Sequence, residues 1–326
     1  MKALRFDAQD TAAVRELPIP EIKDDEVLVA ARAVGVCHSD IELLHGKYII
    51  PFSYPIIPGH EWSGEVVKVG TDVTSLVPGD AVVGECVINE DHFGFSISGA
   101  AAEFFVARPE WLHKLPAGVD YQNGALVEPF SVGYYALMRT GNVNASDVLV
   151  VLGAGPVGLA VVAAAVHLGA TVVVSEPAAH RRDAAVRLGA THAVAPDELD
   201  AVLEELTGGR GADAVLEVTG NPIAMARALE IAAPGGRVTY VGIDVGREAP
   251  AKLGLIQSKE LRINGAIGSP GVWPETLRFM AKCGIDLSPL VTSTYPVDEA
   301  LDALEAAHSG GETTIKAHIV FDATLN

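Results

Sequence analysis

Cysteine and basic residues are both scarce in this chain. It has 3 cysteines in 326 residues, too few for the disulfide framework of a small secreted protein. It has 23 Lys and Arg against 42 Asp and Glu, a formal net charge of −19. Phosphate-bearing partners are held mainly by Lys and Arg, so binding to nucleic acid or to an anionic membrane is not expected.

Long apolar runs are also missing. The stretch that comes nearest to a membrane span covers residues 148–166, but three glycines and Pro156 interrupt it, and a strand followed by a helix accounts for it better. The first residues lack the apolar core of a signal peptide. Cys86 and Cys283 are expected as free thiols, and the protein is expected in the cytoplasm.

The length favours two domains. In the first 130 residues, β-branched runs such as 26–35 and 65–70 alternate with Pro, Gly and Asp, a pattern typical of a β-rich domain. From residue 147 the pattern changes to strand, helix, strand, which is one βαβ unit of a doubly wound parallel sheet. The expected elements of this second part are strands at 148–152, 172–174, 214–218 and 237–241 and helices at 157–168, 181–188 and 223–232.

The end of the chain has a third pattern. Residues 273–283 and 297–308 predict amphipathic helices, and residues 315–321 predict a last strand. We interpret this as a return of the chain to the first domain. The predicted organisation is therefore a β-rich domain of residues 1–129 and 268–326, with an α/β domain of residues 130–267 inserted in it.

A glycine-rich turn stands between the first predicted strand and helix of the inserted domain. It has the spacing G-x-G-x-x-G and is formed around Gly153, Gly155, Pro156, Val157 and Gly158. Glu176 follows the next predicted strand, 18 positions after Gly158. Glycines that let the backbone approach a pyrophosphate, followed by an acidic residue for the ribose, form the dinucleotide-binding fingerprint. The alternative is a glycine turn without a ligand.

Glu176 also bears on the choice of cofactor. A carboxylate at this position accepts hydrogen bonds from the ribose hydroxyls of NAD and repels the 2′-phosphate of NADP. Arg181 and Arg182 lie five and six residues further on and offer a phosphate-binding alternative. Arginines early in a helix are common on a solvated face, so NAD is favoured over NADP.

Four residues of the first domain have side chains suited to zinc. Cys37 and His60 supply a thiolate and an imidazole, and either Glu61 or Glu128 supplies the third ligand. Their wide spacing matches no zinc finger and favours a catalytic site. Asp40 is the candidate acceptor that orients the His60 ring. Each residue alone has a structural alternative, namely a buried thiol, a satisfied histidine or a helix-capping carboxylate. Their joint occurrence favours the metal site.

Several segments together identify a family. The segments 35–40, 59–61, 66–70, 78–82 and 128–133, followed by the glycine turn, occur in the order found in the zinc-dependent medium-chain alcohol dehydrogenases. The chain resembles this family over nearly its whole length. Glu128, at a position where simple alcohol dehydrogenases carry a cysteine, resembles the polyol branch of sorbitol, butanediol and aminocyclitol dehydrogenases. The segment 52–64 is similar to the aminocyclitol (scyllo-inosamine) dehydrogenases in particular.

The resemblance implies a fold and a set of roles. The fold is a Rossmann-type domain inserted in a GroES-like catalytic domain. Cys37, His60 and Glu61 or Glu128 hold one catalytic zinc, and Ser39 binds the substrate hydroxyl and begins the proton relay. His38 lies near the cofactor pyrophosphate. The strand expected at 261–268 resembles the dimer edge of relatives, so a homodimer or homotetramer is expected.

Two departures from the family pattern stand out. The lobe that usually carries four cysteines and a structural zinc is shortened here to residues 84–99, with Cys86 alone, so no structural zinc is expected. The relay histidine that often follows the thiolate is replaced by Glu42. The proton can then leave through Glu42, His45 or water.

The function predicted from the sequence is hydride transfer between a secondary alcohol and NAD, with zinc as Lewis acid. The alcohol is a polyol, an aminocyclitol or a diol. One alternative is a zinc-free, NADPH-dependent reductase of the same superfamily. The other is a non-catalytic nucleotide-binding protein on the same scaffold.

Overall fold

The computed structural model describes residues 1–244, 246–309 and 313–325. It divides into two compact units, residues 1–128 with 270–326 and residues 129–269. These limits fall within two residues of the boundaries predicted from the sequence. No helix among the described residues has both the length and the apolar character needed to cross a bilayer.

The second unit contains a parallel sheet of six strands in the order β12-β11-β10-β13-β14-β15. From β10, the strands β11 and β12 follow on one side of the sheet and β13, β14 and β15 follow on the other. The order of the strands therefore reverses between β10 and β13. This is the doubly wound sheet that the βαβ pattern predicts. The strands are β10 (Val148–Leu152), β11 (Thr171–Ser175), β12 (His192–Val194), β13 (Ala212–Glu217), β14 (Ala232–Tyr240) and β15 (Arg262–Gly265).

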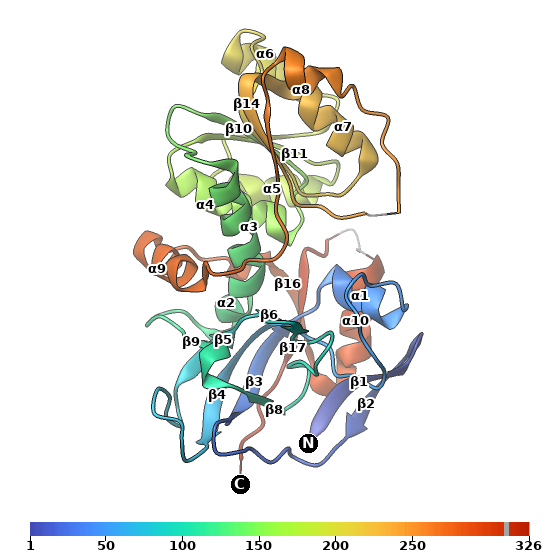
Figure 1. Ribbon diagram of the computed structural model, residues 1–326, viewed down its shortest axis with the longest axis vertical. Helices are drawn as coiled ribbons and strands as arrows, with labels where there is room; N and C mark the ends of the chain where they lie inside the picture. The colour runs from blue at the N-terminus through green and yellow to red at the C-terminus, as the bar shows by residue number, and fades with distance from the viewer. Residues whose placement is uncertain (245, 310–312, 326) are drawn as a thin grey trace. The chain divides into compact units, whose positions relative to one another are not determined.

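Helices connect these strands (Figure 1). In α4, residues 158–165 are all buried, because alanine and valine side chains let the helix approach the sheet closely. The short strand β12 and helix α6 were not expected from the sequence; β12 has three half-buried residues and no apolar run. The helices that belong wholly or mainly to this unit are α3 (Val127–Thr140), α4 (Pro156–His167), α5 (Ala179–Arg187), α6 (Leu199–Thr207), α7 (Pro222–Ile231) and α8 (Gly254–Ser258).

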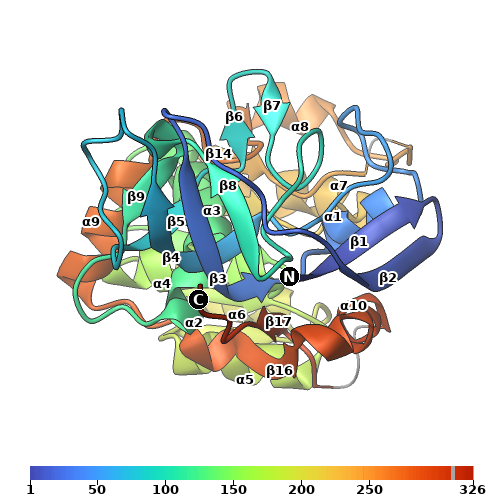
Figure 2. The same ribbon diagram turned by 90° about the horizontal axis from the view of Figure 1, so that it is seen from below.

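The first unit is built on a seven-stranded sheet, several strands of which lie side by side in Figure 2. Its main path runs β16-β17-β3-β4-β5-β9, and β8 pairs with β3. The last strand, β17, lies between β16 and β3, so the chain does return to its first domain as the sequence predicted. The strands are β3 (Val27–Gly35), β4 (Glu61–Val69), β5 (Ala81–Gly84), β8 (Phe104–Ala107), β9 (Leu112–Lys114), β16 (Val291–Pro296) and β17 (Lys316–Val320).

Two hairpins, four α-helices and three short 3₁₀ helices complete the described part of this unit. The first hairpin contacts α10, which also contacts α1. The hairpins are β1 (Lys2–Ala8) with β2 (Thr11–Glu16) and β6 (Val87–Ile88) with β7 (Asp91–His92); the helices are α1 (His38–Leu44), α2 (Tyr121–Ala125), α9 (Trp273–Cys283) and α10 (Ala300–Ser309).

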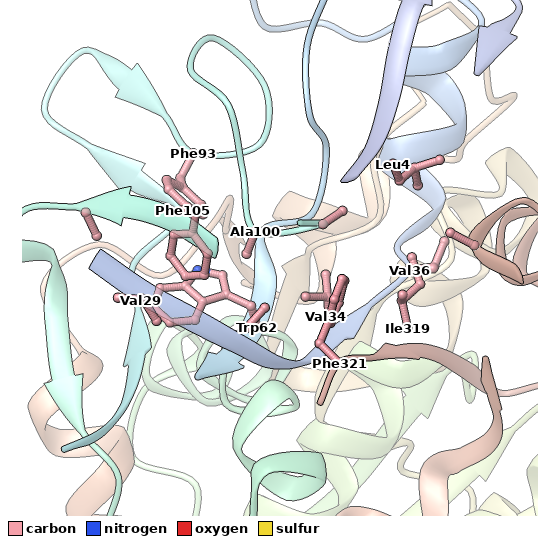
Figure 3. Packing of buried hydrophobic residues seen from close by; sticks show 14 of the residues in the cluster. Leu4, Val29, Val34, Val36, Trp62, Phe93, Ala100, Phe105, Ile319 and Phe321 are labelled. Atoms are coloured by element: carbon pink, nitrogen blue, oxygen red, sulfur yellow. The ribbon is translucent and has the colours of Figure 1, made fainter. Parts of the chain in front are cut away.

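The core of the first unit fixes the strands that carry the candidate ligands. Trp62 of β4 packs edge-on against Phe105 of β8 at 4.7 Å between ring centroids, and Phe93 lies 5.6 Å from Phe105 (Figure 3). Val34 and Ile319 are opposite residues of β3 and β17 and belong to the same buried cluster. Burial of such side chains is the main favourable term in folding, and here it holds β4, β3 and β17 in register.

One buried polar residue of β17 is at odds with its surroundings. His318 has no exposed surface, and neither ring nitrogen has a hydrogen-bond partner among the described residues. Burial, assisted by the positive charge of Lys316, lowers the pKa of His318 to about 3. The folded protein therefore keeps this ring neutral in mild acid, whereas the unfolded chain protonates it near its ordinary pKa of about 6.5.

We predict that His318 makes the first unit sensitive to acid. Above about pH 6.5, His318 does not change the free energy of unfolding. From there towards pH 3 it lowers this free energy by up to roughly 1.4 kcal/mol per pH unit, because only the unfolded state binds the proton. Urea unfolding at several pH values should give a shallower acid slope for His318→Leu than for the wild type. The exposed His308 provides the control variant His308→Leu. Equal slopes for wild type and His318→Leu would contradict the prediction.

Candidate metal and cofactor sites

Three of the predicted metal ligands meet in the first unit. Cys37 precedes α1, His60 immediately precedes β4, and Glu61 is the first residue of β4. Gly35 at the end of β3 pairs with Glu61, and this register brings the three side chains together. Their ligand atoms all lie within 4.8 Å of one another, and His60 and Glu61 are buried. A thiolate, an imidazole and a carboxylate at this separation suit zinc.

Asp40 holds two of these ligands in place. Its Oδ2 accepts a hydrogen bond from the Cys37 backbone N–H at 2.9 Å, and its Oδ1 lies 3.4 Å from His60 Nδ1. Burial lowers the pKa of His60, but the Asp40 carboxylate and the Cys37 side chain outweigh burial and raise it well above its ordinary value. With Nδ1 turned towards Asp40, Nε2 is the ring nitrogen left for a metal.

Glu61 makes a contact that the sequence did not suggest. Its two carboxylate oxygens accept hydrogen bonds from Lys316 Nζ at 2.6 and 2.8 Å, and the same ammonium donates to the Val36 carbonyl at 3.2 Å. Both side chains are buried, with 3% of Lys316 and 2% of Glu61 exposed. A carboxylate oxygen has two lone pairs, so this ion pair leaves Glu61 able to bind a metal as well.

Gly35 makes room for this ion pair. Lys316 belongs to β17 and Glu61 to β4, and β3 lies between the two strands. A Cβ atom on Gly35 would lie 2.4 Å from Glu61 Oε2, closer than real Cβ atoms come to any neighbour. The carboxylate therefore lies over the bare backbone of β3 to reach the ammonium.

Glu128, the rival third ligand, lies outside this three-residue group. It is half-buried in the first turn of α3. Burial, together with the charges of Glu61 and Asp40, raises the pKa of Glu128 to about 7 against the opposing effect of His60 and Lys316. Its carboxylate thus lies within electrostatic reach of the ligands, although its oxygens are not grouped with theirs.

The shortened lobe packs onto the ligands. Phe95, from the segment that follows β7, lies with its ring centroid 4.6 Å from that of His60, and Tyr48 stacks on Phe95 at 4.4 Å. Burial raises the pKa of the neighbouring Cys86 thiol to about 12, so this cysteine stays protonated. Burial also raises the pKa of Tyr48, whose hydroxyl is close enough to respond to the charges of His60 and Cys37.

The remaining predicted residues of the first unit lie on or beside α1. His38 is its exposed first residue and Ser39 its half-buried second residue, two positions after Cys37. Glu42, on the same helix, is half-buried. His45 follows the helix, and its Nδ1 lies 2.6 Å from Asp10 Oδ1. The structure thus keeps both residues named for proton exit close to the segment that carries Ser39.

In the second unit, the glycine turn has the geometry that the fingerprint requires. Gly153 has a φ of 104°, Gly155 caps α4, and Pro156 is the first helical residue. A Cβ on Gly158 would lie 2.2 Å from the Gly153 carbonyl oxygen. Val157 and Gly158 belong to the first turn of α4, where backbone N–H groups lack helical partners and attract anions.

Glu176 lies just after β11, where the fingerprint predicts an acidic residue, and it is buried. Its Oε2 accepts a hydrogen bond from the Ala154 N–H of the glycine turn at 2.8 Å, and its Oε1 accepts one from the Ala178 N–H at 2.9 Å. Each oxygen retains a second lone pair for a ribose hydroxyl.

The two arginines predicted as alternatives for a phosphate differ in the structure. Arg182 donates to the carbonyls of Glu176 and Pro177 at 2.8 and 2.6 Å, so its guanidinium is already engaged by the chain. Arg181 has a buried Nε without a hydrogen-bond partner among the described residues. Of the two arginines, Arg181 is therefore the one that is less engaged by the chain and more available to a phosphate.

Sequence reasoning missed three residues that the structure places at these sites: Lys316 beside Glu61, Phe95 beside His60, and Glu217 beside the glycine turn. Lys316 lies 255 positions from its partner, and no local pattern connects them. Glu217 is the last residue of β13 and lies next to the end of the strand predicted at 214–218, much as Glu176 follows β11, and that parallel was the available signal.

Comparison with protein families covers both units. Residues 23–117 match the alcohol dehydrogenase GroES-like domain, and residues 156–282 match the zinc-binding dehydrogenase family. A sorbitol dehydrogenase of Bacillus subtilis is 32% identical over 332 residues, covering 94% of this chain and 93% of its own length. The chain belongs to the zinc-dependent medium-chain alcohol dehydrogenases. The sheep sorbitol dehydrogenase, 32% identical over 90% of this chain and 89% of its own length, supports the polyol branch.

Solved structures of this dehydrogenase family share the fold. The 2R,3R-butanediol dehydrogenase of Bacillus subtilis has a TM-score of 0.89 at 28% identity and covers 98% of this chain and 99% of its own. A dehydrogenase of Sinorhizobium meliloti 1021, solved with bound NADP, has a TM-score of 0.88 at 27% identity and covers 98% of each chain. This dehydrogenase is thus an oxidoreductase acting on CH–OH groups of small secondary alcohols.

For this dehydrogenase we predict that Gly35→Ala weakens zinc binding by about 10- to 100-fold, the range seen when partners of metal ligands are removed. The added methyl group would displace Glu61 from the position that Lys316 and the ligand group share. Zinc affinity is measured by competition with a chromophoric chelator. Gly254→Ala is the matched control, since its Cβ would meet nothing within 4 Å. Zinc affinity unchanged by Gly35→Ala would contradict the account.

Proposed function

We propose that the protein is a zinc-dependent dehydrogenase that oxidises a polyol, aminocyclitol or diol with NAD. The observation that carries the proposal is the cluster of Cys37, His60 and Glu61, whose ligand atoms lie within 4.8 Å of one another. The sorbitol and butanediol dehydrogenases among the similar proteins support the class of alcohol.

The residues of the cluster fit one zinc ion. Zinc, when bound, supplies a Lewis acid that favours deprotonation of an alcohol near neutral pH. Cys37 and His60 supply a soft and a borderline ligand, and because His60 Nδ1 lies 3.4 Å from Asp40 Oδ1, Nε2 is the nitrogen that would bind the metal. Lys316 supplies a fixed positive charge, which offsets part of the negative charge of the thiolate and the carboxylates.

For the third ligand we choose Glu61 over Glu128. Glu61 belongs to the group of mutually close ligand atoms, whereas Glu128 does not. The two oxygens that Lys316 holds are fixed in orientation, and a fixed carboxylate loses little entropy on binding a metal. Glu128 then remains a half-buried carboxylate beside the ligand set, in reach of substrate hydroxyls and of water.

Ser39 is the proposed first acceptor of the alcohol proton. It follows the thiolate by two residues and is half-buried at the start of α1, so it has one side towards the protein and one towards solvent. A hydroxyl can accept one proton while it donates another, which is what a relay group requires. Glu42, His45 or water carries the proton onward.

The proposed cofactor is NAD, which accepts the hydride when bound. The buried carboxylate of Glu176, fixed by two backbone N–H groups, supports ribose recognition and opposes a 2′-phosphate. Arg181 is the feature that favours NADP, and the related dehydrogenase solved with NADP shows that the scaffold accepts it. A buried carboxylate directly at the end of the strand outweighs an arginine further along the helix.

The oligomeric state and the cytoplasmic location stay predictions. β15 is one of the two edge strands of its sheet, and Ile263 and Ile267 are exposed on and just after it. An exposed strand edge with apolar side chains supports self-association through this strand.

The proposed activity is tested with a panel of sorbitol, xylitol, 2,3-butanediol and an aminocyclitol. We expect formation of reduced nicotinamide, followed by absorbance, with NAD and much less with NADP. Chelation of the metal should abolish turnover, and added zinc should restore it. Reduction of an activated double bond by NADPH, with no zinc retained after dialysis, would instead favour the zinc-free reductase. Cofactor binding without turnover of any alcohol or ketone would favour the non-catalytic alternative.

The choice of third ligand gives a separate prediction. Glu61→Gln should lower zinc affinity beyond the roughly 10- to 100-fold contributed by partners outside the ligand set, because a neutral amide replaces an anionic ligand. Glu128→Gln should stay within that range. Zinc titrations of the two variants against one chelator compare them directly. A larger loss in Glu128→Gln would assign the third ligand to Glu128.

The relay role of Ser39 is tested by two substitutions. Ser39→Ala should lower turnover by about 10²- to 10⁴-fold, the usual contribution of a positioned proton-transfer group, while zinc content stays unchanged. Ser39→Thr keeps a hydroxyl and should retain much more of the turnover. Steady-state kinetics with metal analysis of the same samples checks both points. Turnover unchanged by Ser39→Ala would remove the relay role.

A further inference from the structure

The glycine turn has a neighbour across the point where the sheet reverses. β13 pairs with β10 in parallel register, with Glu217 opposite Leu152, and the Val218 N–H donates to the Leu152 carbonyl at 3.1 Å. The turn that follows β13 therefore leaves the sheet beside the turn that follows β10. Dinucleotides bind in the crevice between two such turns at the carboxyl ends of the strands.

The two turns touch. A Cβ on Gly153 would lie 2.5 Å from Thr219 Cγ2, and one on Gly158 would lie 3.0 Å from Val218 Cγ2. The Thr219 side chain thus occupies the space beside Gly153 that a larger residue would fill. Any shift of residues 218–220 would change the shape of the crevice at the glycine turn.

A single buried carboxylate shapes the turn after β13. Glu217 has no exposed surface. Its Oε1 accepts hydrogen bonds from the Thr219 N–H at 2.8 Å and from the Thr219 hydroxyl, and its Oε2 accepts one from the Gly220 N–H at 3.2 Å. The Glu217 carbonyl also accepts the Val241 N–H at 2.8 Å, which joins the turn to the end of β14.

The hydrogen bonds continue from this carboxylate to the next helix. Thr219 Oγ1 accepts the Asn221 N–H at 2.9 Å, and Asn221 Oδ1 accepts the Ile223 N–H at 2.9 Å as the N-cap of α7. Gly220 has a φ of 67°, and a Cβ on Gly242 would lie 1.9 Å from its nitrogen. The backbone of residues 218–220 therefore has little free space around it, and the Glu217 side chain determines its conformation.

A role in stability alone does not account for a carboxylate here. Glu217 makes no ion pair with a described residue. Burial raises its pKa, although the hydrogen bonds from Thr219 and Gly220 oppose that shift. An apolar side chain at the end of a buried strand would avoid this desolvation. The carboxylate instead fixes the direction of three donors in a turn that borders the crevice.

We propose that Glu217 is a positioning residue for the dinucleotide: it holds Thr219 against Gly153 and so shapes the wall of the crevice opposite Glu176. This inference rests on the proposed function, because it requires the crevice to bind NAD. Glu217 does not touch the reacting atoms. Its contribution is to the affinity for cofactor, and not to zinc binding or to proton transfer.

The test compares variants of the full-length, zinc-loaded enzyme. Glu217→Gln replaces an acceptor with an NH₂ group that opposes either the Thr219 or the Gly220 N–H. We expect the dissociation constant for NADH, measured by fluorescence titration, to be about tenfold higher. This is the effect of losing about one hydrogen bond. The KM for NAD should rise similarly, while the KM for the alcohol, the zinc content and kcat at saturating NAD stay unchanged.

A second variant keeps the test decisive if Glu217→Gln does not fold. Thr219→Val removes the hydroxyl that links Glu217 to Asn221 but keeps a methyl group beside Gly153, and it should weaken NADH binding. Glu198→Gln is the matched control, because Glu198 also accepts a backbone N–H (Ala195, 2.9 Å) in a turn of the same unit, but after the edge strand β12. It should bind NADH like the wild type.

The outcomes separate this inference from the proposed function. If the wild type binds NADH and both Glu217→Gln and Thr219→Val bind it with the same dissociation constant, the positioning role is overturned. The dehydrogenase proposal is then left intact. A variant that only unfolds at lower temperature, with the same dissociation constant at 10 °C, overturns it as well. A wild type that binds neither NADH nor NADPH overturns both.

Discussion

The ion pair of Glu61 and Lys316 is the interaction on which the first unit depends. It is buried, it crosses β3 above Gly35, and it joins the first residue of β4 to the first residue of β17. The lysine also binds the Val36 carbonyl, next to Cys37. One ammonium therefore ties together the segments that carry all three members of the ligand cluster. Breaking a buried pair on one side costs about 3–5 kcal/mol, a large part of the stability of a typical domain.

The second unit also buries carboxylates, but it balances them with neutral hydrogen-bond donors and not with a cation. Glu176 and Glu217 stand at the ends of the two strands that flank β10, and both are buried. Their oxygens are satisfied by backbone N–H groups and one hydroxyl. The Ala154 N–H is thereby taken by Glu176, so an anion at the glycine turn is left with the other amides of the first turn of α4. Carboxylates on both sides give the turn its shape and the helix end gives it its attraction for phosphate.

The sequence was informative where chemistry and spacing are local. The G-x-G-x-x-G turn, the strands of the parallel sheet and the string around Cys37 each carry their own signal, and the structure places them as expected. Ligand chemistry and then the family resemblance joined Cys37 and His60 with either Glu61 or Glu128, which no spacing rule connects; the structure groups Glu61 with the other two. Lys316 and Phe95 lay beyond this reasoning, because their roles arise from strand register and from the packing of the shortened lobe. β12 was missed for a simpler reason: a three-residue, half-buried strand has no apolar run to detect. The helix α6, with Leu199 and Leu203 buried four residues apart, did carry a helical pattern, and it was overlooked.

The central position of β17 has a consequence for biosynthesis. On the ribosome, β3 and β4 emerge early, and the whole of the second unit follows before Lys316 is made. Until then residues 33–35 at the end of β3 lack their β17 partner, although β8 already pairs with residues 27–30, and Glu61 lacks its counter-charge. The parallel sheet can close on its own in the meantime, because all its strands are contiguous in the chain. The order of synthesis thus allows the nascent dehydrogenase to form its nucleotide-binding fold before its catalytic unit can be completed.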